Sequence, residues 1–311
     1  MKVRRLGTSG LKVSVVGLGC NNFGMRIDAA QTQTVVDAAI DAGITLFDTA
    51  DIYGGTKSEE FLGKALGKRR HEIVLATKFG MQIGQDPKKR GGSRKWILQA
   101  VEDSLTRLGT DYIDLYQHHQ PDADTPVDET LRALDDLVTQ GKVRYLGNSN
   151  YTGWQIADAD WTAAGGSRFV SAQNLYSLLE RDVEREVLPA CEHFGLGFLP
   201  FFPLASGLLS GKYKRGAPPP EGTRLQAWGA RGQASMTDAN FDKLEALEAW
   251  AAARGHTILE LAFAWLLGHP AVSSVIAGAT TPDQVRTNAA TAEWALTPDE
   301  VAEVGKLISL P

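Results

Sequence analysis

Apolar strands and amphipathic helices alternate along this chain, and that alternation constrains its fold more than any other feature. We expect eight strands, at residues 13–19, 44–50, 72–78, 112–119, 143–150, 169–175, 196–201 and 272–278. We expect helices between and after them, at residues 28–41, 58–66, 96–108, 127–138, 154–164, 183–193, 241–254 and 258–267. Eight such units predict a closed parallel α/β barrel, the (β/α)8 TIM barrel. Since barrels of this kind reach this length as one domain, we expect a single domain over residues 1–311.

Two segments depart from the alternation. Turn residues Thr8, Ser9 and Gly10 predict an N-terminal β-hairpin before the first strand. Residues 206–236, after the seventh strand, follow neither a helical nor a strand pattern. A structureless connection of that length in a compact domain is usually functional, such as a lid or a binding loop. We therefore expect a long functional loop after strand seven.

A doubly wound sheet is the alternative architecture. It normally carries a glycine-rich dinucleotide fingerprint directly after its first strand. The segment GLGCNNFG, from Gly17 to Gly24, has its glycines at the wrong spacing, and the next helix begins only at Asp28. The sequence therefore favours the barrel.

Residues at several helix ends support the expected boundaries. Asp28 can cap the start of the first helix, and Gly43 can adopt the left-handed conformation at its end. Near the C-terminus two segments combine proline at the first helical position with an expected capping box, Thr281 with Gln284 and Thr297 with Glu300.

Composition excludes several classes of partner. A net charge of −5 and a pI near 5.7 give no basic face for nucleic acid. The two cysteines, Cys20 and Cys191, are too few for a disulfide framework, which indicates a reducing compartment. No segment approaches the roughly 18 consecutive apolar residues of a membrane helix. We therefore expect a cytoplasmic protein whose partner is neither nucleic acid nor a membrane.

Polar side chains gather where the expected strands end. Asp48 ends the second strand, with Tyr53 in the loop that follows, Lys78 ends the third, and His118 and His119 end the fourth. In α/β barrels the carboxyl ends of the strands face the active site, so these side chains should meet there. The structural alternative is a buried ion pair of Asp48 with Lys78, beside a structural histidine and an ordinary loop tyrosine.

Taken together, four of these residues suggest an acid catalyst. A tyrosine has an unperturbed pKa of about 10, which an adjacent lysine ammonium lowers by favouring the phenolate. We expect Asp48 to hold Lys78, and Lys78 to lower the pKa of Tyr53. His119 could donate to, or steer, a carbonyl oxygen. Such a site suits protonation of a developing alkoxide as a hydride reaches the carbon.

The chain resembles the aldo-keto reductase family over nearly its full length. The matching segments are GLGCNNFG, FDTADIYGGTKSEEFLGKAL, LATKFG, SLTRLGTDYIDLYQHHQPD, LGNSN, AQNLYS, PLASGLLSGKY and VIAGATTPDQVRTNAA. The branch is similar to bacterial reductases and potassium-channel β subunits. The resemblance implies a barrel, a nicotinamide cofactor bound without a Rossmann fold, and a catalytic tetrad of Asp48, Tyr53, Lys78 and His119. His119 fits the family's His-x-Pro spacing, since Pro121 follows it.

The same resemblance implies a set of cofactor-binding residues. Ser149, Asn150 and Gln173 match positions that hold the nicotinamide carboxamide, and Phe201 stands where a tyrosine usually stacks on the ring. The pyrophosphate would lie along Leu204, Ser206 and Lys212, and Asn288 is the usual adenine contact. The full implied set is Cys20, Asn21, Asp48, Ser149, Asn150, Gln173, Phe201, Leu204, Ser206, Lys212, Arg224, Gly278, Gln284 and Asn288.

Cofactor selectivity is where the chain departs from its family. Many members grip the 2′-phosphate with Lys-Ser and then arginine, but Gly278 with Ala279 and then Gln284 stand at these positions here. Phe202 replaces a common small polar residue, and Thr287 replaces a frequent glutamate. Arg224 matches a position that can supply the missing charge. We therefore expect NADPH or NADP⁺, with NADH as the alternative.

Three functions fit the sequence. The first is an oxidoreductase that reduces a small-molecule aldehyde or ketone to its alcohol, with Tyr53 as general acid. The second is a cofactor-binding redox sensor or regulatory barrel with slow turnover. The third is a metal-dependent hydrolase using Asp48, Asp51, His118 and His119, which six histidines in the whole chain make the weakest. We expect the walls of the substrate pocket around Phe23, Phe79 and the segment near Trp228.

Overall fold

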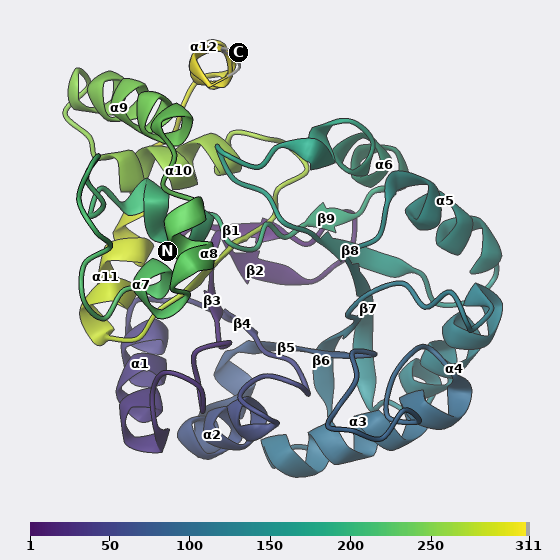
Figure 1. Cartoon of the computed structure of the whole chain (residues 1–311). Coiled ribbons are helices and arrows are strands. Elements are labelled where there is room, and N and C mark those ends of the chain that lie inside the picture. The colour runs from purple at the N-terminus through teal and green to yellow at the C-terminus, as the bar shows by residue number, and fades with distance from the viewer. Residues whose placement is uncertain (309–311) are drawn as a thin grey trace.

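The computed structural model describes residues 1–308 and has the predicted barrel architecture (Figure 1). Within these residues, eight parallel strands form one sheet in the order β10-β3-β4-β5-β6-β7-β8-β9. The sheet closes on itself because Phe198 and Phe201, in and after β9, form parallel bridges to Val272 and Ile276. The strands are β3 (Val16–Gly19), β4 (Leu46–Asp48), β5 (Val74–Phe79), β6 (Ile113–His118), β7 (Val143–Ser149), β8 (Phe169–Gln173), β9 (Gly197–Phe198) and β10 (Val275–Gly278).

Helices surround the strands, and α1 to α6 follow one another around the barrel in chain order (Figure 1). The α-helices are α1 (Ala29–Asp41), α2 (Lys57–Leu66), α3 (Arg94–Leu108), α4 (Val127–Thr139), α5 (Gly153–Thr162), α6 (Val187–Phe194), α7 (Arg224–Ala227), α8 (Ala230–Ala234), α9 (Asp238–Ala252), α10 (Ile258–Leu267), α11 (Pro282–Ala290) and α12 (Pro298–Leu307). The 3₁₀ segments are η1 (Gly67–Glu72), η2 (Asp182–Glu184), η3 (Ala205–Ser210) and η4 (Thr291–Glu293). Among residues 1–308 no helix combines the length and apolar character needed to cross a membrane.

The N-terminal hairpin is present, but the expected strand at 13–19 is two strands. Its first residues belong to β2 (Lys12–Ser14), which pairs antiparallel with β1 (Val3–Arg5), and the barrel strand β3 begins at Val16. The hairpin packs onto the barrel, because Leu6 and Val13 are fully buried in its interior cluster.

Other boundaries also differ from expectation. The helix expected at 183–193 is broken into η2 and α6, because Glu186 has a non-helical backbone with φ −141° and ψ −35°. The segment 206–236 is not structureless, since it carries most of η3 and the short helices α7 and α8.

The helix caps are mostly as predicted. Asp28 caps α1 and Gly43 has φ +76°. The capping box of Thr297 with Glu300 is confirmed, but Gln284 bonds Thr280 and leaves Thr281 as a single cap.

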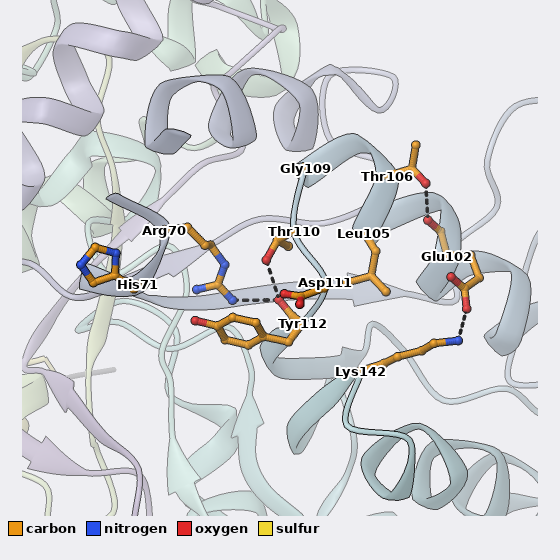
Figure 2. A pocket seen from close by; sticks show the side chains of 10 residues that line it. All are labelled: Arg70, His71, Glu102, Leu105, Thr106, Gly109, Thr110, Asp111, Tyr112 and Lys142. Atoms are coloured by element: carbon orange, nitrogen blue, oxygen red, sulfur yellow. Dashed lines mark hydrogen bonds and ion pairs between the residues drawn. The ribbon is translucent and has the colours of Figure 1, made fainter. Parts of the chain in front are cut away.

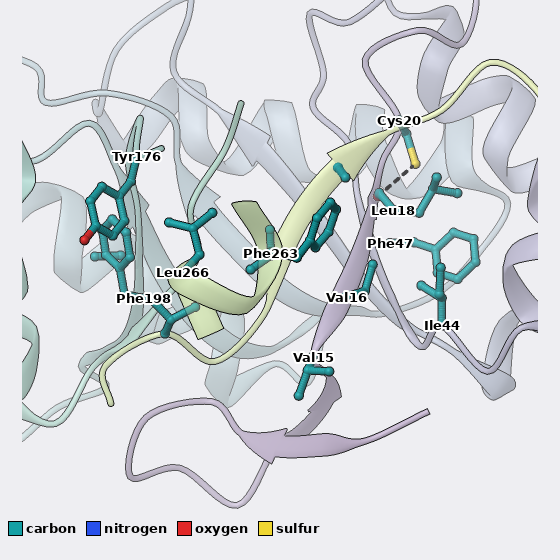
Figure 3. Close-up of a cluster of buried hydrophobic side chains, with 14 of the residues drawn as sticks. Val15, Val16, Leu18, Cys20, Ile44, Phe47, Tyr176, Phe198, Phe263 and Leu266 are labelled. Carbon is teal, nitrogen blue, oxygen red and sulfur yellow. Dashed lines mark hydrogen bonds between the residues drawn. The ribbon is translucent and has the colours of Figure 1, made fainter. Parts of the chain in front are cut away.

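Strict alternation along the strands separates two hydrophobic layers. An outer layer fills the space between strands and helices, and part of it, including Phe263 and Leu266 of α10, is drawn in Figure 3. The smaller layer fills the barrel interior and consists of Leu6, Val13, Leu46, Ala76, Leu115, Leu199 and Ile276. Because strand side chains alternate with a period of two, residues two positions after Leu46, Ala76 and Leu115 also point inward. Those residues are Asp48, Lys78 and Gln117.

One irregularity in β8 brings a further polar side chain into the barrel. Leu146 of β7 pairs with Phe169, but the next residue, Gly147, pairs with Ser171, so β8 contains one extra residue here. Strict alternation would place Gln173 on the same side as Phe169, which lies in the outer core. The extra residue reverses that alternation, as a β-bulge does. Gln173 therefore points inward, where it contacts Asp48.

The close packing of α2 against α3 supports the loop that carries Tyr53. At the start of α2, Ser58 donates to the carbonyl oxygen of Cys20 at 2.8 Å. One residue later, Glu59 accepts from Thr77 Oγ1 and from Arg107 of α3 at 2.5 and 2.7 Å. A Cβ atom at Gly63 would lie only 2.4 Å from the carbonyl oxygen of Leu108, so glycine permits this approach of the two helices.

We predict that Gly63→Ala destabilises the protein even though alanine favours helix. The added methyl group meets backbone rather than a flexible side chain, and overpacking of this kind typically costs about 1–3 kcal/mol. Chemical unfolding measures the change, with Lys64→Ala on the exposed side of α2 as the control, expected within about 0.5 kcal/mol of wild type. A Gly63→Ala protein as stable as the control would contradict the close approach.

Candidate active site

A cavity of about 870 Å³ opens at the carboxyl ends of the barrel strands. It is lined by every residue predicted for catalysis or cofactor binding except Lys78, which lies fully buried behind it. The predicted residues on its wall are Cys20, Asn21, Asp48, Tyr53, His119, Ser149, Asn150, Gln173, Phe201, Leu204, Ser206, Lys212, Arg224, Gly278, Gln284 and Asn288. The strand-end residues and the residues implied by the family resemblance therefore lie around one cavity.

Lys78 joins the other two members of the expected relay. Its Nζ donates to Asp48 Oδ2 at 2.6 Å, to the carbonyl oxygen of Thr49 at 2.9 Å and to the Tyr53 hydroxyl at 3.3 Å. Asp48 and Lys78 are almost completely buried. The arrangement contains the structural ion pair that was the alternative interpretation, and it also brings the ammonium to the phenol.

The pKa of Tyr53 reflects two opposing effects. Burial raises it above the usual value of 10, and Lys78 opposes that rise without reversing it. Lys78 therefore lowers the pKa of Tyr53 as expected, but in the protein alone burial outweighs this effect. Burial would lower the pKa of Lys78, but Asp48 and Tyr53 raise it overall. At neutral pH the site holds a protonated phenol beside a charged ammonium, so Tyr53 has a proton to give.

The two adjacent histidines have different surroundings. Burial, with Lys78 and His118 nearby, holds the pKa of His119 well below 6.5, so His119 is a neutral imidazole. Its ring lies edge-on to Tyr53, with centroids 5.7 Å apart, and it lines the cavity. His118 points away into the outer core, where its Nδ1 lies 2.9 Å from the Tyr151 hydroxyl and its ring stacks on Phe79. Only His119 is placed to meet a ligand.

Asp48 also has amide partners, one of which was not predicted. Gln117 and Gln173 each direct Nε2 to Asp48 Oδ1, at 3.0 and 2.9 Å. Gln117 lies two residues after Leu115 and two before His119, so all three side chains point into the barrel. This spacing was the signal available in the sequence.

The four residues of the metal-hydrolase alternative do not form a ligand set. Across residues 1–308, no three His, Cys, Asp or Glu side chains are grouped as a metal ion requires. Asp48 is engaged by Lys78, and His118 by Tyr151. Burial, with Glu59 nearby, raises the pKa of Asp51 well above its usual value, which disfavours the carboxylate form that binds a metal ion.

A family model supplies the decisive comparison. The model described as the aldo/keto reductase family matches residues 15–309. The chain belongs to the aldo/keto reductase family. This match confirms the family resemblance and the barrel expected from the sequence. Members of the family are oxidoreductases that generally use nicotinamide cofactors.

Curated relatives cover most of the chain. A probable voltage-gated potassium channel subunit beta from Oryza sativa subsp. japonica is 38% identical over 297 residues, covering 93% of this chain and 90% of the relative. The uncharacterized oxidoreductase YrpG of Bacillus subtilis (strain 168) is 39% identical over 301 residues, covering 92% and 89%. An L-glyceraldehyde 3-phosphate reductase from Escherichia coli O157:H7 is 35% identical over 306 residues, covering 93% and 86%.

The cavity of this aldo/keto reductase fits the carboxamide of a nicotinamide. Gln173 uses Nε2 for Asp48 and Gln117, and Asn150 uses Nδ2 for the His119 carbonyl and Ser149 Oγ. Among residues 1–308, Gln173 Oε1 and Asn150 Oδ1 have no hydrogen-bond donor, and both residues line the cavity. Two acceptors and the hydroxyl proton of Ser149 complement the two N–H groups and one carbonyl oxygen of a carboxamide.

Three cations lie on the cavity wall, Arg26, Lys212 and Arg224. Arg26, which was not predicted, donates to the Gly222 carbonyl at 2.7 Å, and Arg224 donates to Asn22 Oδ1 at 3.3 Å. Burial and then Arg26 and Arg224 lower the pKa of Lys212. Within residues 1–308 no carboxylate forms an ion pair with any of them. Cations without an ion-pair partner are suited to binding a phosphate, although Glu221 and Asp283 also line the cavity.

The cavity walls come from the expected loops, since Asn22, Met81 and Arg224 line the cavity, but the expected aromatic side chains do not line it. Phe23 and Phe79 are fully buried away from the cavity, and Trp228 does not line it. The apolar wall is instead formed by Met81, Phe201, Phe202, Pro203, Leu204, Leu259, Ile276 and Ala277. Phe79 lies at the end of β5, near the cavity in sequence. Because side chains alternate along the strand, however, Phe79 points into the outer core.

The backbone next to Phe201 is strained. Phe202, Ala205 and Ser206 have φ of +53°, +45° and +60°, values that non-glycine residues rarely adopt. The guanidinium of Arg224 lies 5.1 Å from the centroid of the Phe202 ring. Strain of this kind clusters at ligand sites, which is consistent with the predicted pyrophosphate position at Leu204 and Ser206.

A second hollow, of about 730 Å³, lies near the amino ends of β5, β6 and β7 (Figure 2). Its cations already have partners. Arg70 bonds Asp114 and the Tyr112 carbonyl, and Lys142 bonds Glu102. This hollow therefore lacks the unpaired cations of the first cavity.

We predict that Lys78→Met moves the pH dependence of activity upward. Lys78 is the charge that opposes the rise in the pKa of Tyr53, so its loss leaves burial unopposed. Alcohol oxidation, which needs the phenolate, should begin only at higher pH, and carbonyl reduction should slow because Tyr53 becomes a weaker acid. Profiles of kcat/KM against pH in both directions measure the shift.

Asp48→Asn is the matched comparison. Asp48 itself raises the pKa of Tyr53, so its neutralisation partly offsets the weaker hold on Lys78. The upward shift in the pH profile should therefore be smaller for Asp48→Asn than for Lys78→Met. Unchanged profiles in both variants would leave the buried pair a structural ion pair only.

Proposed function

We propose that this chain is an NADPH-dependent reductase that converts aldehydes or ketones to alcohols, with residues 1–311 as one catalytic domain in the cytoplasm. Its substrate is a small-molecule carbonyl or alcohol. The observation that carries the proposal is the position of the Tyr53 hydroxyl, 3.3 Å from Lys78 Nζ, on the wall of a cavity whose polar atoms complement a carboxamide.

A bound reduced nicotinamide supplies the hydride. Tyr53 gives its proton to the carbonyl oxygen as negative charge develops there, and the Lys78 ammonium stabilises the phenolate that remains. Asp48 keeps Lys78 charged and in place. Neutral His119, when it carries its proton on Nε2, donates a hydrogen bond to the same carbonyl oxygen and so orients the substrate.

Cation placement supports NADPH over NADH. Lys212 and the backbone near Ser206 would serve the pyrophosphate, which both cofactors share. Arg224 and Arg26 would then bind the 2′-phosphate, in place of the Lys-Ser and arginine pattern that this chain lacks. Guanidinium groups suit this role because they bind phosphate through two parallel hydrogen bonds.

A regulatory role is the second candidate. The rice relative is named a probable voltage-gated potassium channel subunit beta, a name that is compatible with a regulatory role. All four tetrad residues are present here, which favours turnover. Steady-state assays of an aldehyde and sugar panel, with NADPH and with NADH, separate the two, because a slow sensor would turn over none of them at an enzymatic rate.

We predict that Tyr53→Phe abolishes carbonyl reduction and leaves cofactor binding intact. Tyr53 is the proposed proton donor, and positioned acid catalysis is worth about 10²–10⁴-fold. Steady-state kcat and fluorescence titration of NADPH measure the two effects. Tyr112→Phe, at the opposite end of the barrel, is the control. Retention of more than about a tenth of wild-type kcat by Tyr53→Phe would exclude Tyr53 as the acid.

We predict that Arg224→Ala weakens NADPH selectively, whereas Lys212→Ala weakens NADPH and NADH together. A hydrogen bond to a charged group is worth roughly 1.5–3 kcal/mol, so each loss should weaken binding about ten- to a hundredfold. Titration of both cofactors measures the change. Arg215→Ala is the control, since Arg215 is bound by Asp238, Asp242 and Glu245 and does not line the cavity. Equal loss of both cofactors in Arg224→Ala would show that Arg224 is not the selector.

A further inference from the structure

We infer that Gln117 is a positioning residue that fixes the catalytic carboxylate of Asp48 and the carboxamide-binding side chain of Gln173 in one shared orientation. The inference rests on the proposed function, because it assigns Gln173 to the nicotinamide. Gln117 does not line the cavity, is fully buried and lies opposite Lys78 in the pairing of β5 with β6.

Three side chains form a closed ring of hydrogen bonds in the barrel interior. Gln117 Nε2 donates to Asp48 Oδ1 at 3.0 Å, and Gln173 Nε2 donates to the same oxygen at 2.9 Å. Gln173 Nε2 also donates to Gln117 Oε1 at 3.2 Å. Since Lys78 occupies Asp48 Oδ2, both carboxylate oxygens are held by donors.

The charge of Asp48 determines which way both amides point. An ionised carboxylate only accepts hydrogen bonds, so Gln117 must present its nitrogen to Asp48 and its oxygen to Gln173. That oxygen, together with Asp48, then requires the nitrogen of Gln173. Consequently Gln173 turns Oε1 toward the cavity, where it can accept from the carboxamide N–H of a nicotinamide.

Loss of Gln117 would loosen this orientation. Without the Gln117 oxygen, Gln173 keeps only its bond to Asp48 Oδ1, so Oε1 is held less firmly in the position that accepts from the carboxamide. Asp48 would also lose one of its two Oδ1 donors. The effect should fall on the nicotinamide half of the cofactor, because the adenine and phosphate contacts are made by other parts of the chain.

The test compares two ligands that share the adenine and phosphate half. Gln117→Leu in the full chain should bind NADP⁺ about tenfold more weakly than wild type, while 2′-phospho-ADP-ribose, which lacks the nicotinamide, binds unchanged. Isothermal titration calorimetry measures both. Tyr116→Phe, on the same strand, is the control, because the Tyr116 hydroxyl is buried and has no hydrogen-bond partner among residues 1–308. Tyr116→Phe should change the affinity for neither ligand.

A second variant keeps the inference testable if Gln117→Leu folds poorly. In Gln117→Glu, a protonated carboxyl group can still donate to Asp48 and accept from Gln173, whereas the ionised form repels Asp48. NADP⁺ affinity of this variant should approach wild type at low pH and fall as pH rises, with wild type unchanged over the same range.

Equal weakening of both ligands in Gln117→Leu, or no weakening of either, would overturn the inference. An affinity for NADP⁺ that does not vary with pH in Gln117→Glu would do the same. Failure of the proposed function is seen separately in wild type, as NADP⁺ binding without turnover of any aldehyde. Wild-type protein that binds neither ligand would overturn both.

Discussion

The ammonium of Lys78 is the charge on which the upper interior of this barrel depends. It is fully buried and is stabilised by Asp48, a backbone carbonyl and the Tyr53 hydroxyl. Removing one partner of a buried ion pair typically costs about 3–5 kcal/mol, because the other charge is left uncompensated. The same contacts that keep this charge inside the protein set the environment of the phenol, so stability and chemistry share one set of atoms.

Strand geometry delivers the residues around that charge. The inward alternation of β4, β5 and β6 places Asp48, Lys78 and Gln117 above the apolar layer formed in part by Leu46 and Leu115. The extra residue in β8 then rotates Gln173 into the same space. Four polar side chains are therefore concentrated at one level of the barrel, where each satisfies another, next to the apolar layer.

Much of this arrangement could be predicted from the sequence, because the signals are periodic or local. Alternation of strands and helices identified the barrel, and strand-end polarity identified Asp48, Tyr53, Lys78 and His119. Gln117 was missed because a single amide in an apolar strand is not unusual. It is recognised only when the alternation of inward and outward side chains is traced from Leu115. Arg26 was missed because its neighbours in the site come from residues 206–236, far along the chain. The bulge in β8 and the outward turn of Phe79 depend on pairing between strands, which a single strand does not reveal.

The N-terminal hairpin has a kinetic consequence. Leu6 and Val13 are fully buried in the apolar layer that fills the barrel interior, so among residues 1–308 this layer separates the cavity from the amino end of the barrel. The cavity opens at the carboxyl ends of the strands. A ligand seated beside Gln173 and Ser149 at the inner wall would then be covered by whatever binds after it. Such a blind-ended site favours a compulsory order, in which the first molecule to arrive is the last to depart.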